Sequence, residues 1–177
     1  MKTKTDSTPI IGLDLGDRRH TVCVLDTAGE ILAEFSIPNT HEQLEGLSRQ
    51  YPGAVIAMET GTHSPWISRL LEAKGHRVYV ANARKVRAIS QSQTKSDKED
   101  ARMLARLARV DPKLLSPIRH RSEGAQRALV RLKVRDALVR SRVNQANSVR
   151  FLLKSLGIAV PSAVKATVFV RRVREAL

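Results

Sequence analysis

The chain has 177 residues, of which 42% are apolar and only 3% aromatic, a composition that allows an aliphatic core and excludes wholesale disorder. Its 31 Lys and Arg against 17 Asp and Glu leave a formal net charge of +14, which indicates a polyanionic partner, either nucleic acid or an anionic membrane surface. The single cysteine excludes an internal disulfide framework and a cysteine-rich zinc site. Because neither a signal peptide nor an apolar run near the ~18 residues of a membrane span is found, we expect a soluble cytoplasmic protein that binds nucleic acid and no membrane.

The first forty residues predict three short strands. An apolar run over 10–16 closes on glycine, 20–26 contains several β-branched residues, and 31–37 ends at Pro38. Because only short turns separate these segments, the three strands should form an antiparallel meander.

Two strand–helix units follow the meander. Helical spacing of apolar residues predicts a helix over about 41–51, and an apolar strand follows over 54–58. A helix capped by Thr62 or Ser64 then leads to a fifth strand over 77–81. This order predicts a mixed α/β sheet with parallel crossovers, which is the order of the RNase H-like fold. A Rossmann domain, built from repeated βαβ units, would not begin with a meander.

Two helices are predicted after the fifth strand. Residues 82–90 suit a short helix. Ser96 is a suitable N-cap for a second helix from Asp97 to about Val110, and Glu99 at its third position completes a capping box.

A long helix is predicted from Glu123 to about Leu156, because 125–156 contain neither proline nor glycine. Since an apolar stripe on such a helix needs a partner, we expect a coiled coil or a helical hairpin. Asp136 and Arg150 interrupt a heptad seam formed by Leu129, Leu132, Val139, Val143, Ala146 and Leu153. Pro161 begins a further short helical stretch that runs to the last residue.

The excess of positive charge lies in the last third of the chain. Residues 1–118 hold 17 basic and 14 acidic side chains, whereas 119–177 hold 14 basic and 3 acidic ones. A solvated charged helix is the plain interpretation, but so many uncompensated charges would repel one another without a polyanion. Aromatic residues are scarce in this segment, so we expect contacts with phosphates rather than stacking on bases. The predicted nucleic-acid contacts are Arg84, Lys85, Arg87, Lys95, Arg127, Arg131, Lys133, Arg135, Arg140 and Arg142.

Four acidic residues stand where an α/β sheet places its functional groups. Asp14 interrupts an apolar strand, where a carboxylate is costly unless it is paired or binds a cation. Glu59 follows the fourth strand, and carboxyl ends of strands are where open α/β sheets bind ligands. Asp97 and Asp100, spaced i, i+3, share one helix face. These four residues are the predicted catalytic and metal-binding group, which we call the acidic quartet.

A divalent cation resolves the repulsion within the acidic quartet. Gathered without a cation, four carboxylates would retain one or two protons. Oxygen ligands with no histidine or cysteine cluster fit Mg²⁺ or Mn²⁺ rather than zinc, and a pair of such ions can act on a phosphodiester. Each carboxylate also has a structural interpretation, such as a helix N-terminal charge for Asp97 or a partner for Lys98 in the case of Asp100. His63 fits either a substrate contact or a structural role.

The motifs around these residues resemble the DEDD transposases of the IS110 insertion-sequence family and the related pilin-gene DNA invertases. The resemblance covers about 10–118, and it rests on Ile11-Gly12-Leu13-Asp14, on Met58-Glu59-Thr60-Gly61 and on the run Lys95-Ser96-Asp97-Lys98-Glu99-Asp100-Ala101. It implies a RuvC-like, RNase H-like domain whose quartet binds divalent metal, followed by a coiled coil. It also implies DNA transposition or recombination, a homodimer or tetramer, guidance by a structured RNA, and a bacterial, nucleoid-associated protein.

Members of that family continue into a second domain that supplies a catalytic serine, whereas this sequence stops at Leu177. We therefore expect a flexible N-terminus over 1–9, a RuvC-like domain over 10–118, a basic long helix or coiled coil over 119–160, and over 161–177 the start of a helical segment without the C-terminal transposase domain. Two alternatives stay open. One is a structure-selective nuclease of the Holliday-junction resolvase type, and the other is a truncated, non-catalytic regulator that binds nucleic acid.

Overall fold

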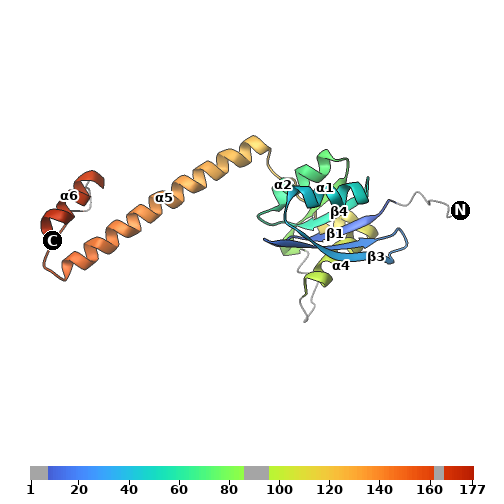
Figure 1. The fold of residues 1–177 in the computed structure, drawn as a ribbon, viewed down its shortest axis with the longest axis horizontal. Helices are drawn as coiled ribbons and strands as arrows, with labels where there is room; N and C mark the ends of the chain where they lie inside the picture. The colour runs from blue at the N-terminus through green and yellow to red at the C-terminus, as the bar shows by residue number, and fades with distance from the viewer. Residues whose placement is uncertain (1–7, 86–95, 162–165) are drawn as a thin grey trace. The chain divides into compact units, whose positions relative to one another are not determined.

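The computed structural model describes residues 8–85, 96–161 and 166–177. The chain forms two compact units, Met1–His120 and Arg121–Leu177, which are described separately (Figure 1). Within the described residues, no helix is long and apolar enough to cross a membrane.

A five-stranded mixed sheet organises the first unit. The strand order is β3-β2-β1-β4-β5, in which β1, β2 and β3 are antiparallel neighbours and β4 and β5 run parallel to β1. The predicted meander and the parallel crossovers are both confirmed, and this connectivity is that of an RNase H-like fold. The strands are β1 (Ile10–Asp14), β2 (Arg19–Leu25), β3 (Ile31–Pro38), β4 (Val55–Glu59) and β5 (Arg77–Ala81).

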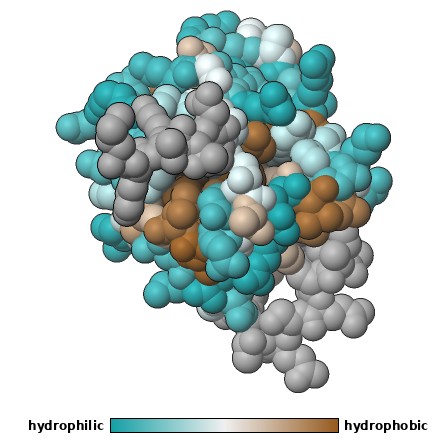
Figure 2. Space-filling view, turned by 90° about the vertical axis from the view of Figure 1, so that its right-hand side faces the viewer, coloured by the Kyte–Doolittle hydropathy of each residue, from teal (hydrophilic) through white to brown (hydrophobic). Residues whose placement is uncertain are grey.

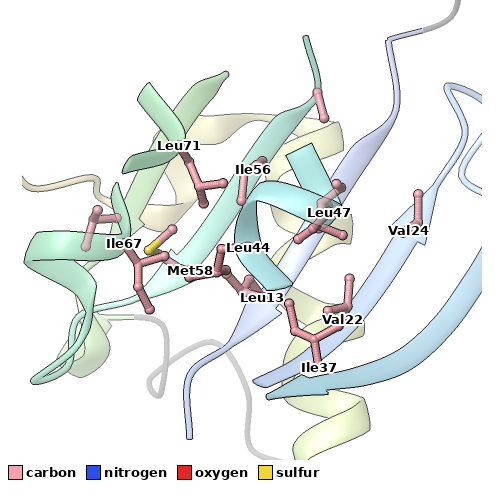
Figure 3. Packing of buried hydrophobic residues seen from close by; sticks show 13 residues of the cluster. Leu13, Val22, Val24, Ile37, Leu44, Leu47, Ile56, Met58, Ile67 and Leu71 are labelled. Atoms are coloured by element: carbon pink, nitrogen blue, oxygen red, sulfur yellow. The ribbon is translucent and has the colours of Figure 1, made fainter. Parts of the chain in front are cut away.

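Helices cover both faces of this sheet. On one face, α1 (His41–Gln50) and α2 (Ser64–Ala73) pack their buried leucines and isoleucine against the strands (Figure 3). On the other face, α4 (Asp97–Val110) and the short 3₁₀ helix η1 (Pro112–Leu115) close a second, smaller core. The alternation of side chains along each strand explains why two separate apolar clusters form. The expected helix over 82–90 falls mostly outside the described residues, which end at 85 in this region.

Side-chain caps begin α1 and α4, and the cap of α4 by Ser96 was predicted. The hydroxyl of Thr40 accepts a hydrogen bond from the Gln43 amide at the start of α1, and Ser96 accepts one from the Glu99 amide at the start of α4. The predicted cap of α2 by Thr62 or Ser64 is wrong. Its N-cap is His63, without a side-chain cap, because the Ser64 hydroxyl instead closes a turn by donating to the Gly61 carbonyl at 2.8 Å.

The second unit contains a long helix and a short one. The 32 residues of α5 (Glu123–Lys154) extend for about 48 Å at 1.5 Å per residue. At its end, Arg150 donates a hydrogen bond to the Pro161 carbonyl at 3.1 Å and lies 5.0 Å from the ring centre of Phe169 in α6 (Ala166–Ala176). Leu153 is buried, whereas many apolar residues of α5 are exposed, among them Val130, Leu132, Leu138 and Val143.

The close approach of α4 to β1 depends on Gly12. A Cβ atom at Gly12 would lie 1.9 Å from the Ala101 carbonyl oxygen and 2.7 Å from the Ala105 nitrogen, far inside contact distance. Two hydrogen bonds from Arg102 to Glu34 of β3, one of them 2.7 Å long, tie the same helix to the edge of the sheet. The helix backbone therefore rests directly on the β1 backbone.

Gly12→Ala should destabilise the first unit by about 2–3 kcal/mol, because α4 must move away from the sheet to admit one methyl group. Urea unfolding followed by circular dichroism measures this change. Gly46→Ala in α1 is the matched control, since a Cβ atom there would meet only the end of the Arg49 guanidinium, at 4.0 Å. This control should be neutral or stabilising by up to about 1 kcal/mol. Equal stability of the two variants would contradict the proposed backbone contact.

Candidate functional site

Asp14 and Glu59 are neighbours at the carboxyl edge of the sheet. The parallel register pairs Leu13 of β1 with Met58 of β4, and the next residue in each strand is the carboxylate. Adjacent strands lie about 4.8 Å apart, and residues in register point to the same face. Leu13 and Met58 belong to the core under α1 and α2, so Asp14 and Glu59 face α4.

The first turn of α4 brings two more carboxylates to this edge. Ala101 of α4 lies over Gly12, two residues before Asp14 on the same face of β1. Asp97 and Asp100 therefore precede the point of closest contact by one turn or less, with Asp97 exposed and Asp100 half-buried. The four members of the acidic quartet thus come from two strand ends and one helix start.

The electrostatics of Asp14 show that the quartet shares one neighbourhood. The pKa of the Asp14 carboxyl is raised to about 6, and burial is the largest cause. The negative charges of Asp97, Asp100 and Glu59 raise the same pKa further, in that order. A hydrogen bond from the backbone of Leu15 acts in the opposite direction. Asp14 is therefore a carboxylate that gains from a nearby positive charge.

The donor chemistry of the quartet suits a hard divalent cation. All four side chains offer carboxylate oxygens, which Mg²⁺ and Mn²⁺ prefer. Within the described part of the chain, however, no three His, Cys, Asp or Glu side chains are placed closely enough to hold an ion as they stand. The carboxylates interact at the range of charge repulsion rather than of ligation, so binding would require their side chains to close on the cation.

The predicted phosphate contacts divide between the two units. Arg84 and Lys85 are exposed just after β5, whereas Arg87 and Lys95 lie outside the described residues. The remaining six are all exposed on α5: Arg127, Arg131, Lys133, Arg135, Arg140 and Arg142. Two of these six form ion pairs within the helix, Arg127 with Glu123 and Arg140 with Asp136 at 2.9 Å.

Sequence reasoning did not foresee a contact between the loops that follow β1 and β4. The Asp17 carboxylate lies 3.1 Å from Nε2 of His63, and the Trp66 indole donates to Nδ1 of the same imidazole at 3.3 Å. Because Nδ1 accepts this bond, Nε2 carries the proton and donates to Asp17. His41 of α1 stacks on Trp66 with 4.5 Å between ring centres. In the sequence, this contact is indicated by the position of His63, four residues after Glu59.

These features define a class of protein: an RNase H-like α/β domain with carboxylates at the carboxyl edge of its sheet, followed by a basic helix. The model of a transposase family, the DEDD transposases of IS110 type, matches residues 11–158. The chain therefore belongs to the IS110 family of DEDD transposases.

Individual known proteins also resemble the chain. A transposase of insertion sequence element IS1328 from Yersinia enterocolitica is 28% identical over 156 residues, which are 88% of this chain and 45% of that protein. The chain thus spans about half the length of this curated relative. The RuvC structure from Thermus thermophilus is 14% identical with a TM-score of 0.38, and the match covers 59% of this chain and 97% of RuvC.

The raised pKa of Asp14 predicts a pH-dependent stability. In the folded chain this pKa is about 6 against an ordinary 3.8, so the folded state holds the proton more tightly than the unfolded state. The resulting stabilisation is fully present below about pH 4 and is lost as the pH rises through 6. Asp14→Asn, which stays uncharged, should match the native chain near pH 4 and exceed its stability by about 1 kcal/mol at pH 7, after allowance for solvent screening.

Thermal and urea unfolding in EDTA between pH 4 and pH 7 measure this difference. Glu99→Gln, an exposed position in the same turn of α4, is the matched control for removal of a negative charge. A gain for Asp14→Asn that does not change with pH would contradict the burial of Asp14 among the other carboxylates.

Proposed function

We propose that the chain is the metal-binding N-terminal part of a DNA transposase or recombinase that acts on DNA phosphodiester bonds. Membership of the IS110 family supports the reaction class. The observation that carries the proposal is the convergence of the quartet on Asp14, whose pKa three carboxylates raise. Such an arrangement is unfavourable in an unliganded structural site and favourable around a divalent cation.

The four carboxylates of the quartet divide into two pairs with different roles in this proposal. Asp14 and Glu59, fixed by the sheet register, form the rigid half of the site. Asp97 and Asp100, in the first turn of α4, form the half that side-chain rotation can adjust, because the helix backbone itself rests on β1. Bound Mg²⁺ or Mn²⁺ would activate a nucleophile and stabilise the leaving oxygen of the phosphodiester. The chain's own carboxylates supply the negative charge that balances the cation, and they position the edge of the sheet against the DNA backbone.

The rest of the chain supplies contacts with nucleic acid. We assign metal-dependent chemistry to 10–118, DNA binding and assembly to 119–160, and a further helical segment to 161–177. The exposed basic side chains of α5 suit DNA phosphates, and a structured guide RNA would be bound by the same chemistry. Such a protein works on the nucleoid in the bacterial cytoplasm.

The heptad seam of α5 suits a homodimeric or tetrameric coiled coil, but its flanks oppose assembly. Leu132 and Val143 on the seam are exposed. With Leu129 at position a, Lys133 and Arg140 occupy position e, and Arg135 and Arg142 occupy position g. Positive charges would face one another across a parallel or an antiparallel pair. Assembly through α5 is therefore favoured when a polyanion neutralises these flanks.

A non-catalytic regulator is the second candidate, because no three carboxylates of the described residues lie close enough to hold an ion as they stand. In that case the chain would bind nucleic acid or full-length subunits, and its carboxylates would carry out no chemistry alone. Metal binding by the isolated chain distinguishes the two candidates.

Mn²⁺ titrated into the nucleic-acid-free chain should bind saturably in a calorimeter. Asp14→Ala and Asp100→Asn should weaken this binding by more than the roughly 10-fold that loss of an outer-shell partner costs. Glu99→Gln, which removes a carboxylate from the same turn of α4, should bind Mn²⁺ like the native chain. Equal weakening in all three variants would indicate a diffuse charge effect, and absence of binding by the native chain would favour the regulator.

Replacing basic residues beside the heptad seam of α5 with neutral ones should weaken DNA binding and strengthen self-association. The double variant Arg135→Gln/Arg140→Gln should bind duplex DNA more weakly, with the slope of log K against log salt reduced by about 2. The same variant should self-associate more tightly in analytical ultracentrifugation, because like charges leave the interface.

The double variant Arg127→Gln/Arg131→Gln is the matched control, since these arginines lie at heptad positions f and c, away from the seam. It should lose a similar part of the salt dependence without any gain in self-association. Equal self-association of the two double variants would contradict the proposed seam.

A further inference from the structure

Three aromatic side chains form a connected group at the carboxyl edge of the sheet. His41 stacks on Trp66 with an interplanar angle of 26°, and Trp66 donates its indole proton to His63 at 3.3 Å. We call these three residues the aromatic cluster. Trp66 is the single tryptophan of a chain with only three phenylalanines and two tyrosines. Aromatic side chains are thus scarce in this protein, and its single tryptophan lies at this edge of the sheet.

Within the aromatic cluster, Trp66 packs against the core, whereas His41 and His63 are accessible to solvent. Trp66 is half-buried and packs against the core under α1 and α2. His41, which covers Trp66, is exposed, and the His63 side chain keeps 29% of its surface exposed. A ring stack held by hydrogen bonds loses little further freedom when another flat ring is added to it.

The aromatic cluster lies at the same edge of the sheet as the acidic quartet, and two short segments of the chain connect the two groups. His63 is four residues after Glu59, and its partner Asp17 is three residues after Asp14. Arg18 is exposed on the same loop, and its carbonyl accepts a hydrogen bond from the Asn39 amide just before α1. The quartet faces α4, whereas Trp66 packs under α1 and α2, so a DNA strand that crosses this edge of the sheet from one face to the other would meet the quartet and then His41.

We propose that the aromatic cluster stacks an unpaired base of the DNA strand that enters the acidic quartet. This inference rests on the proposed function, and it adds that the strand is unpaired where the quartet acts. Base–aromatic stacking tolerates any sequence, because every base has a π face. The exposed ring of His41 is the stacking surface, Trp66 supports it from below, and the bond to His63 holds the indole in place. Arg18 supplies a positive charge for the adjoining phosphate.

The emission of Trp66 tests the proposal, because no other tryptophan contributes to it. The native full chain is titrated at pH 8 in EDTA with a 12-nucleotide single strand, and in parallel with an abasic strand of the same length. The base-bearing strand should quench Trp66 emission. The abasic strand, which keeps the phosphates that α5 binds, should leave the emission unchanged. Equal quenching by both strands overturns the proposal.

Variants locate the stacking surface. His41→Ala should raise the strand concentration needed for half-maximal quenching by about 5- to 10-fold, which is the lower range for loss of one stacked ring. Gln43→Ala, exposed on the same turn of α1, is the matched control and should behave like the native chain. Identical titrations of these two variants overturn the proposal even if both retain the native fold.

The fluorescence titration in EDTA tests base stacking separately from metal binding. Base-dependent quenching without any Mn²⁺ binding would support the stacking surface and count against the metal site. Mn²⁺ binding by the native chain without base-dependent quenching would overturn the stacking surface alone.

Discussion

The backbone contact between α4 and β1 at Gly12 is the constraint on which the first unit depends. A side chain at this position would have to share space with the Ala101 carbonyl. Because the helix rests on the strand itself, its first turn reaches the end of β1, where Asp14 stands. One missing Cβ atom thereby determines how far Asp97 and Asp100 lie from the carboxylates of the sheet. The second core, the Arg102–Glu34 ion pair and the quartet all follow from that approach.

Opposite charges are separated along the chain in a way that suits a nucleic-acid enzyme. Four carboxylates gather at one edge of the first unit, whereas α5 carries exposed arginines and lysines around much of its circumference. The carboxylates repel one another, as the raised pKa of Asp14 records, and the arginines flanking the seam of α5 do the same. Both groups therefore gain from a counter-ion, a divalent cation in one case and a polyphosphate in the other. The proposed metal-dependent reaction on DNA would bring the two counter-ions together.

Much of the fold could be predicted from local patterns, because the elements are short and strongly punctuated. Pro38 ends β3 where expected, and Ser96 caps α4 as its sequence indicates. The cap of α2 could not be predicted, since Ser64 has a choice between capping a helix and closing a turn with Gly61. Local propensity does not decide between two hydrogen bonds of similar strength.

The candidate site was predictable as a list of residues but not as an arrangement. A carboxylate inside an apolar strand marks Asp14, and i, i+3 spacing relates Asp97 to Asp100 within one helix. Nothing in the order of residues places α4 on the sheet face of Asp14 rather than on the face of Leu13. The contact of His63 with Asp17 likewise joins residues that are 46 positions apart in sequence.

The sequence by itself determined the order of strands and helices, the basic character of the last third and the identity of the acidic residues. These properties depend on hydrophobic periodicity, turn residues and charge, which act between near neighbours. Only the tertiary structure decided which carboxylates share a neighbourhood, why Gly12 is required and which rings stack at the edge of the sheet. Those relations depend on distances across the sheet, and packing of the whole core sets such distances.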